Sequence, residues 1–261
     1  MLDFIYYPVS AVLWVWHTAF AALLGASSGL AWVLAIVFLV MTLRALLFRP
    51  FMAQLKFSRA LTEMQPKMQE IKKKHAGDRE KQAAAIQQLQ ADAGVNILTG
   101  FLPIIGQTVV FIGLYHVLRS FKDPNVANYV FSTGQVQSFL HAKFFGAPLT
   151  ATLSTAGSSF GTVAAVAIPL MVIAAISTHF TARAAISRQQ PPADGAAGQQ
   201  ARIMNMLSQW VFPVGVLMFG PVMPVAILLY FVTQNAWTFA QQHLVASRFP
   251  QPQPRADTVK P

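Results

Sequence analysis

An arginine stands inside an apolar segment of this chain. Residues 30–48 read LAWVLAIVFLVMTLRALLF, and Arg44 is the one charged side chain among them. Arg49 follows five residues later, so Arg44 lies about 7–8 Å deeper along a helix that rises ~1.5 Å per residue. Its guanidinium could reach the membrane surface along its apolar stem. It could also face a water-filled cavity, where intramembrane charges usually mark pathways or binding sites.

Two further apolar segments carry polar side chains. In segment 97–118, Gln107, Phe111 and Tyr115 recur every four residues and share one helical face. The last apolar segment holds six amides and hydroxyls: Thr233, Gln234, Asn235, Thr238, Gln241 and Gln242. Hydrogen bonds between helices, at ~0.6 kcal/mol each on average, would account for one or two such groups. Six of them, beside an arginine in another segment, favour a polar cavity open to the cytoplasm.

Composition indicates which elements must position these residues. Hydrophobic residues make up 54% of the 261 positions and charged residues 11%, less than half the roughly 25% of a soluble domain. Several apolar stretches approach the ~20 residues that cross ~30 Å of hydrocarbon. We therefore predict an all-α polytopic membrane protein with five transmembrane helices. The predicted order is an N-terminal interfacial helix (1–28), a first span (29–49), a cytoplasmic helical hairpin (50–95), a second span (96–118), an extracytoplasmic loop (119–161), a third span (162–182), a cytoplasmic loop (183–204), the fourth and fifth spans (205–243) and a disordered cytoplasmic tail (244–261).

The N-terminal segment has two interpretations. Apolar residues recur at helical spacing through Val9, Leu13, Trp16, Phe20 and Leu24, which favours an amphipathic helix lying in the membrane interface. A sixth span is the alternative. A secretory signal is not expected, because Met1-Leu2-Asp3 brings no positive charge.

The segments between the spans differ in character. Helix formers dominate residues 51–92, and Ala76-Gly77-Asp78 interrupts them, which predicts a hairpin of two helices. Residues 119–161 are expected to form short helices lying on the surface. Residues 189–200 (QQPPADGAAGQQ) and the tail have the composition of disordered segments.

Basic residues predict the orientation. Segments 49–96, 183–204 and 244–261 together hold fifteen Lys and Arg, whereas the predicted opposite side holds Arg119, Lys122 and Lys143. By the positive-inside rule the N-terminus lies outside and the C-terminus in the cytoplasm. The net charge of +10 is thereby explained by topology, without specific nucleic-acid recognition.

Enzymatic chemistry has little support in the sequence. There are no cysteines, which excludes disulfides and thiolate catalysis. Residues 157–161 (GSSFG) match G-x-S-x-G, but they abut a predicted span instead of a strand–turn–helix. The six histidines fall in separate segments without metal-ligand spacing. We therefore expect no enzyme activity, no catalytic residue, no metal site and no cofactor.

Taken together, four stretches resemble one known family. LAWVLAIVFLVMTLRALLFRPF is followed by the charged hairpin, then by FLPIIGQTVVFIGLYHVL, FFGAPL and LLYFVTQNAWTFAQQ. In this order they are similar to the bacterial YidC-type membrane protein insertases, relatives of the mitochondrial and chloroplast insertases. The resemblance runs from about residue 4 to residue 244. This sequence departs from some members of the family in two features, since it has no lipobox cysteine and no long basic tail.

The resemblance implies five helices around a hydrophilic groove that opens to the cytoplasm and to lipid. It places the family's groove arginine at Arg44 and the other substrate-binding groove positions at Gln107, Phe111, Tyr115, Tyr230, Gln234 and Asn235. It also implies a bacterial plasma membrane location. The implied partners are nascent membrane proteins and membrane lipids, with the secretion translocon and the ribosome as further candidates.

Three functional hypotheses follow from these residues and this resemblance. In the first, an insertase lets polar segments of nascent proteins enter the groove, where Arg44 holds acidic residues transiently, and then releases the apolar helix into lipid. In the second, a channel or carrier for small anions uses Arg44 as its selectivity charge. In the third, an assembly chaperone acts through packing alone, and Arg44 is dispensable.

Overall fold

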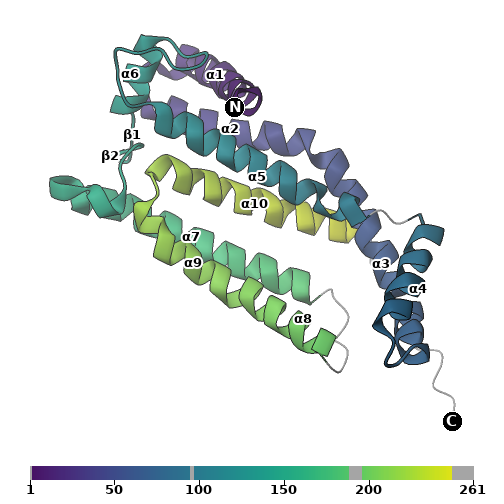
Figure 1. Cartoon of the computed structure of the whole chain (residues 1–261). Helices are drawn as coiled ribbons and strands as arrows, with labels where there is room; N and C mark the ends of the chain where they lie inside the picture. The colour runs from purple at the N-terminus through teal and green to yellow at the C-terminus, as the bar shows by residue number, and fades with distance from the viewer. Residues whose placement is uncertain (1, 95–96, 188–195, 249–261) are drawn as a thin grey trace. The chain divides into compact units, whose positions relative to one another are not determined.

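The computed structural model describes residues 2–94, 97–187 and 196–248, and this part of the chain is predominantly helical (Figure 1). The prediction of a disordered tail (244–261) is wrong for residues 244–248, which continue the last helix, and its remainder lies outside the described residues. In chain order the elements are α1 (Asp3–Leu24), α2 (Gly29–Leu46), α3 (Phe48–Lys74), α4 (Arg79–Asp92), α5 (Ile97–Ser120), α6 (Thr133–His141), β1 (Lys143–Phe144), β2 (Ala147–Pro148), the 3-10 turns η1 (Leu153–Thr155) and η2 (Gly157–Ser159), α7 (Phe160–Ile186), α8 (Ala196–Met206), the π-helical turn η3 (Leu207–Val211), α9 (Phe212–Phe219), the 3-10 turn η4 (Gly220–Val222) and α10 (Val225–Arg248).

These elements divide into two compact units. The first unit comprises residues 1–47 and 104–237, and the second comprises residues 48–103 and 238–261. Helices α5 and α10 each contribute to both. Arg44, Gln107, Gln234 and Asn235 belong to the first unit, whereas Thr238, Gln241 and Gln242 of the last apolar segment belong to the second.

Four stretches of the described chain are long and apolar enough to cross a membrane. They are Asp3–Leu24, Gly29–Leu46, Gly157–Ile186 and Gln199–Val222. This set includes α1 and omits α10, which the sequence also predicts to span. In α5, another predicted span, the side chains of residues 97–104 lie outside the described part of the chain. The amides and hydroxyls of α10 lower its hydropathy, and this is the physical reason that composition alone does not identify it. A multi-pass membrane protein is supported, and the number of five spans stays a prediction.

Helix α1 packs against α2 and α5. The His17 ring stacks on Trp32 of α2 with ring centroids 3.6 Å apart, and Trp16 Nε1 donates a hydrogen bond to Thr42 Oγ1 at 2.9 Å. Against α5, the contact is made at Gly113, where a Cβ atom would lie 2.9 Å from Val9 Cγ2. A small residue is needed there because the two helices approach closely.

One end of the first unit is closed by aromatic packing, and we call it the capped end. Helix α6 starts with a capping box between Ser132 and Gln135. Its Ser138 Oγ accepts a hydrogen bond from Trp32 Nε1 at 3.0 Å. The Trp32 ring also contacts the rings of Phe121, Phe131 and Phe139. The short helices expected within residues 119–161 are present as α6, η1 and η2.

A two-stranded hairpin, which the sequence did not predict, completes the capped end. Strands β1 and β2 pair antiparallel. The chain after β2 supplies two carbonyl acceptors to the start of α10, since the Val225 and Ala226 N–H groups donate to Ala151 and Leu149 at 3.0 Å. These bonds satisfy N–H groups that a helix start leaves without intrahelical partners.

Helices α7 and α9 pack side by side (Figure 1). The helix leading to α9 starts at Ala196, so the expectation of disorder for residues 189–200 is wrong for its last five residues. Alanine and glutamine, which are good helix formers, explain the difference. Around the π-helical turn η3, His179 Nδ1 lies 2.8 Å from the Gln209 carbonyl oxygen, which ties α7 to η3.

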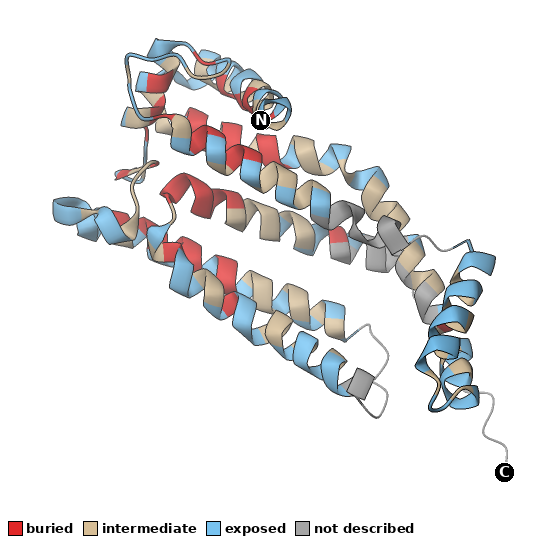
Figure 2. Cartoon of the chain, in the orientation of Figure 1, coloured by how far each residue is buried: buried red, intermediate tan, exposed pale blue. Residues whose placement is uncertain are grey.

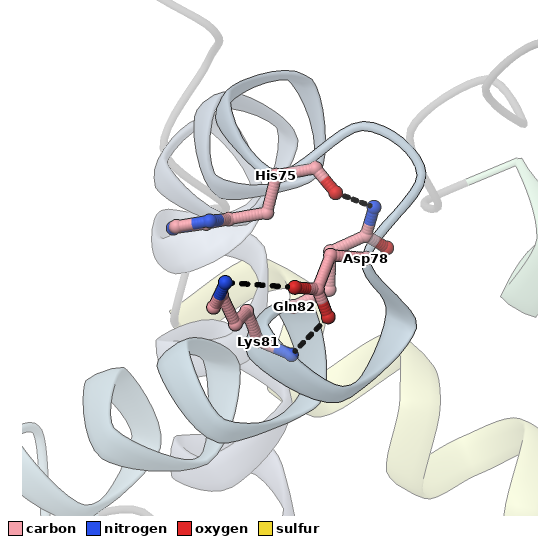
Figure 3. A network of polar contacts seen from close by, with 4 residues as sticks. All are labelled: His75, Asp78, Lys81 and Gln82. Atoms are coloured by element: carbon pink, nitrogen blue, oxygen red, sulfur yellow. Dashed lines mark hydrogen bonds and ion pairs between the residues drawn. The ribbon is translucent and has the colours of Figure 1, made fainter.

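In the second unit, α3 and α4 form a hairpin whose turn lies at residues 75–78 (Figure 3). Asp78 caps α4, because its Oδ1 accepts a hydrogen bond from the Lys81 backbone N–H at 3.0 Å. That bond holds the pKa of the Asp78 carboxyl below its usual range, and the hydrogen bond with the Lys81 side chain adds to this effect. Gln82 Nε2 donates to the His75 carbonyl at 2.7 Å and closes the turn. Gly77, at φ +96°, provides the reversal.

Candidate functional site: a polar cluster between helices

Arg44 makes a contact across the helix bundle. It lies in the last turn of α2, and its Nε donates a hydrogen bond to Gln234 Oε1 of α10 at 3.0 Å. Both side chains are half-buried. The sequence placed these two residues in one site, and the structure brings them together. An amide oxygen is a neutral acceptor, so this bond orients the guanidinium without neutralising its charge.

One turn earlier on α10, Tyr230 meets α5. Gln107 Nε2 donates a hydrogen bond to the Tyr230 hydroxyl, and the Tyr230 side chain is 1% exposed. Positions 230 and 234 are four residues apart and therefore share a helical face. We call Arg44, Gln107, Tyr230 and Gln234 the polar cluster.

Aromatic rings extend the cluster along α5 toward the capped end. The Phe111 ring centroid lies 5.9 Å from those of both Tyr230 and Tyr115. Tyr115 is half-buried, and its hydroxyl accepts a hydrogen bond from Arg119 Nη1 at 2.9 Å. Phe111 thus contacts Tyr230 of the polar cluster, whereas Tyr115 binds a cation nearer the other end of α5.

Asn235 has a different role from its neighbour Gln234. Its Nδ2 lies 3.3 Å from both the Ala174 carbonyl oxygen and Thr178 Oγ1 of α7. Thr178 Oγ1 in turn donates to the same carbonyl at 2.8 Å. Asn235 therefore joins α10 to α7 and stands apart from the polar cluster. Sequence reasoning missed Thr178, because a single threonine in an apolar span carries no distinctive pattern.

Burial changes along the helices that carry the cluster. In α2 and α10 most of the buried residues lie toward the capped end, and the described side chains beyond them are half-buried or exposed, apart from the buried Gln241 (Figure 2). Tyr230 is the last residue of a continuous buried run in α10, and residues 231–235 are half-buried. The packing is therefore densest at the capped end and looser where Arg44 and Gln234 meet. Among the described residues, no group of three or more His, Asp or Glu side chains could hold a metal ion.

Comparison with known proteins identifies the family. The family described as 60Kd inner membrane protein matches residues 23–252, most of the chain. The chain belongs to this family. A relative from Mycolicibacterium paratuberculosis is 44% identical over 94% of this chain and 75% of its own length. A relative from Mycobacterium tuberculosis H37Rv is 44% identical over 94% of this chain and 72% of its own.

A more distant relative, from Streptomyces avermitilis, is 32% identical over 99% of this chain and 61% of its own length. All three relatives carry the name membrane protein insertase YidC. None of these names describes a channel or a carrier, so the anion-channel hypothesis gains no support from them.

Proposed function

We propose that this chain is a membrane protein insertase, which helps nascent membrane proteins to place their apolar helices in the lipid bilayer. The observation that carries this proposal is the 44% identity to proteins named insertases over 94% of the chain. The structure adds a cation on α2, a helix long and apolar enough to cross a membrane, and this cation contacts a polar side chain of α10. The cell membrane of a bacterium is the location that the family name and these helices imply.

The arrangement that we propose has five spans: α2, α5, α7, the continuous helix from α8 to α9, and α10. They would surround a hydrophilic groove lined by Arg44, Gln107, Phe111, Tyr115, Tyr230, Gln234 and Asn235. The half-burial of Arg44 and Gln234 supports such a groove, because loosely packed polar side chains leave room for water or substrate. The polar cluster would line this groove between α2, α5 and α10, and the contact of Asn235 with α7 would hold α7 beside it.

We propose that α1 lies in the outer interface instead of spanning the membrane. Two contacts support this. Near its first turn, Tyr6 stacks on His116, close to the end of α5, with ring centroids 3.9 Å apart. Just after its last turn, the Ala26 carbonyl accepts a hydrogen bond from Ser138 of α6. Both termini of α1 therefore meet segments of the capped end, as expected of a helix lying across it.

We propose that the capped end lies outside and the α3–α4 hairpin in the cytoplasm, because one set of loops carries the excess of basic residues. The groove would then open toward the cytoplasm, where nascent chains emerge. With this orientation, we propose three further partners: membrane lipids, the secretion translocon and the ribosome.

The energetics of the proposed mechanism need no nucleotide. A polar segment that enters the groove stays partly solvated, so less of the membrane remains to be crossed without water. An acidic residue near Arg44 gains about 1 kcal/mol at ~4 Å in water-like surroundings and about 4 kcal/mol at an effective dielectric constant of ~20. Such attraction holds a segment briefly and still allows its release. Partition of the substrate's apolar helix into lipid supplies the driving force.

The test uses the purified chain reconstituted in lipid vesicles and a single-span substrate with an acidic N-terminal segment. We expect the segment to become protected from external protease in these vesicles and to stay accessible in protein-free vesicles. Equal protection in both would overturn the insertase proposal. Anion flux through the same vesicles distinguishes the alternative, since a channel would conduct without inserting the substrate.

A further inference from the structure

The β1–β2 hairpin ends in an unusual turn. Its register pairs Phe144 with Ala147, which leaves Phe145 and Gly146 as the two loop residues. Both have positive φ, +48° and +84°. A two-residue turn of this kind favours Asn-Gly or Gly-Gly, since only small or locally hydrogen-bonding residues adopt that backbone without strain. Here an aromatic residue occupies the first position.

The two phenylalanines of this turn contact each other, with ring centroids 4.5 Å apart, but they differ in burial. Phe144 is half-buried and packs against the hydrophobic core. Phe145 is 82% exposed, the largest exposed fraction among the large apolar side chains of the described chain. Strained backbone clusters at functional sites, so this exposed ring is a candidate contact for a partner outside the fold.

Three membrane helices determine the position of this turn. A Cβ at Gly29, the first residue of α2, would collide with the backbone carbonyl of Lys143. A Cβ at Gly146 would lie 3.1 Å from Thr162 Cγ2, in the first turn of α7. The carbonyls just after β2 bind the start of α10. The turn therefore lies level with the points where α2, α7 and α10 begin.

We infer that the Phe144–Ala147 turn is a membrane anchor, with the Phe145 ring inserted among the headgroups and upper acyl chains of the outer leaflet. This rests on the membrane arrangement in the proposed function. The occupant is lipid, because the turn adjoins α7, whose exposed side chains Ile168, Val172 and Ile173 form an apolar outer surface. Lys143, exposed and two residues before Phe145, lies where it can bind the phosphate of an anionic lipid. Anchoring here would hold the capped end at a fixed depth.

The absence of cysteine allows a direct depth measurement, since one introduced cysteine takes one nitroxide label. We would label Phe145→Cys, Ile173→Cys and Gln137→Cys in the full chain, reconstituted in phosphatidylethanolamine–phosphatidylglycerol vesicles. Relaxation by oxygen, which concentrates in lipid, and by a water-soluble nickel chelate gives the depth of each label. We expect residue 145 to lie just below the headgroups, between residue 173 in the hydrocarbon and residue 137 in water.

Equal exposure of residues 145 and 137 to the nickel chelate would overturn the anchor. A label at residue 173 that is itself in water would instead contradict the proposed membrane arrangement, so the two failures are distinguishable. The charge is tested separately: we expect label 145 to move toward water when phosphatidylglycerol is replaced by phosphatidylcholine, and Lys143→Gln to abolish that dependence. A depth that ignores lipid charge would remove Lys143 from the proposal.

A second measurement avoids a cysteine in the strained turn. A photoreactive phenylalanine analogue at position 145 should form lipid adducts on illumination, whereas the same analogue at position 137 should not. Adducts to another protein, or none to lipid, would overturn the inference. Phe145→Asn serves as the matched variant, because asparagine suits this turn. We expect this variant to fold normally. When it also carries the nitroxide label at Gln137→Cys, we expect that label to lie farther from the membrane than in the chain with Phe145.

Discussion

Substituting Gly113 by alanine should loosen the packing of α1 on α5. The added Cβ would lie 2.9 Å from Val9 Cγ2 and 3.0 Å from Ile5 Cγ2. Ordinary contacts begin near 3.4 Å, so these methyl groups must move by about half an ångström. Overpacking of this kind costs about 1–3 kcal/mol, and the better helix propensity of alanine returns at most ~1 kcal/mol. We expect a net loss of about 1–2 kcal/mol.

Second-site compensation makes this prediction specific. Val9→Ala removes the nearer methyl group and alone should cost about 1–2 kcal/mol of packing. In the double variant the new Cβ occupies part of the vacated space, so the combined loss should fall below the sum of the single losses by about 1 kcal/mol.

The assay is reversible unfolding of the four proteins in mixed micelles, followed by circular dichroism. Gly215→Ala is the control, because a Cβ there meets nothing within 4 Å, and it should be at least as stable as the unmodified chain. Strictly additive losses would refute the packing described for Gly113.

Three further outcomes are expected. Tyr230→Phe should lower the free energy of unfolding by about 0.6 kcal/mol, and at most ~1.7, because it removes one interhelical hydrogen bond. Tyr230→Ala should lower it by about 3–5 kcal/mol, because it removes a buried ring. Similar losses for the two variants in an unfolding assay would argue against the bond to Gln107. Thr178→Val and Asn235→Leu should show a coupling of about 0.6 kcal/mol in a double-mutant cycle. Full additivity would mean that the contact between Thr178 and Asn235 does not stabilise the protein. Asp78→Ala should speed hydrogen exchange in the first turn of α4. The pKa of Asp78 is lowered in the folded protein, so its cap stabilises α4 fully above the unfolded pKa of ~3.9 and is lost as pH falls through the folded value. Asp78→Asn should protect α4 from exchange at all pH values. Protection that does not depend on acid in the chain with aspartate would contradict this.

Hydropathy and helix signals were sufficient for much of the fold. The apolar run around Arg44 predicts a helix because its length and composition leave few alternatives, and the structure has α2 there. Short helices are expected between residues 119 and 161, and the structure has α6 there, which starts at a capping box formed by residues only three positions apart. The β1–β2 hairpin escaped prediction because Phe145 stands where the turn type calls for asparagine or glycine.

The site shows where a single sequence stops being informative. Gln234 and Asn235 are adjacent amides, and nothing in their types tells which helix each one meets. The rotation of α10 decides it, since it directs Gln234 to α2 and Asn235 to α7. That rotation depends on contacts far apart in the chain, including the binding of the α10 start by the Leu149 and Ala151 carbonyls.

The central claim is that Arg44 acts on substrate through its charge. The most direct measurement compares insertion by the unmodified chain, Arg44→Lys and Arg44→Ala, using two substrates whose outer segments are either acidic or neutralised. Arg183→Ala, which removes an exposed arginine at the end of α7, is the matched control. With the acidic substrate we expect Arg44→Ala to lower insertion about fivefold or more, as about 1 kcal/mol or more per charge pair implies. Arg44→Lys and Arg183→Ala should retain most activity, and the neutral substrate should respond weakly to every variant. If Arg44→Ala inserts the acidic substrate as well as the unmodified chain does, the charge plays no part and the claim is wrong.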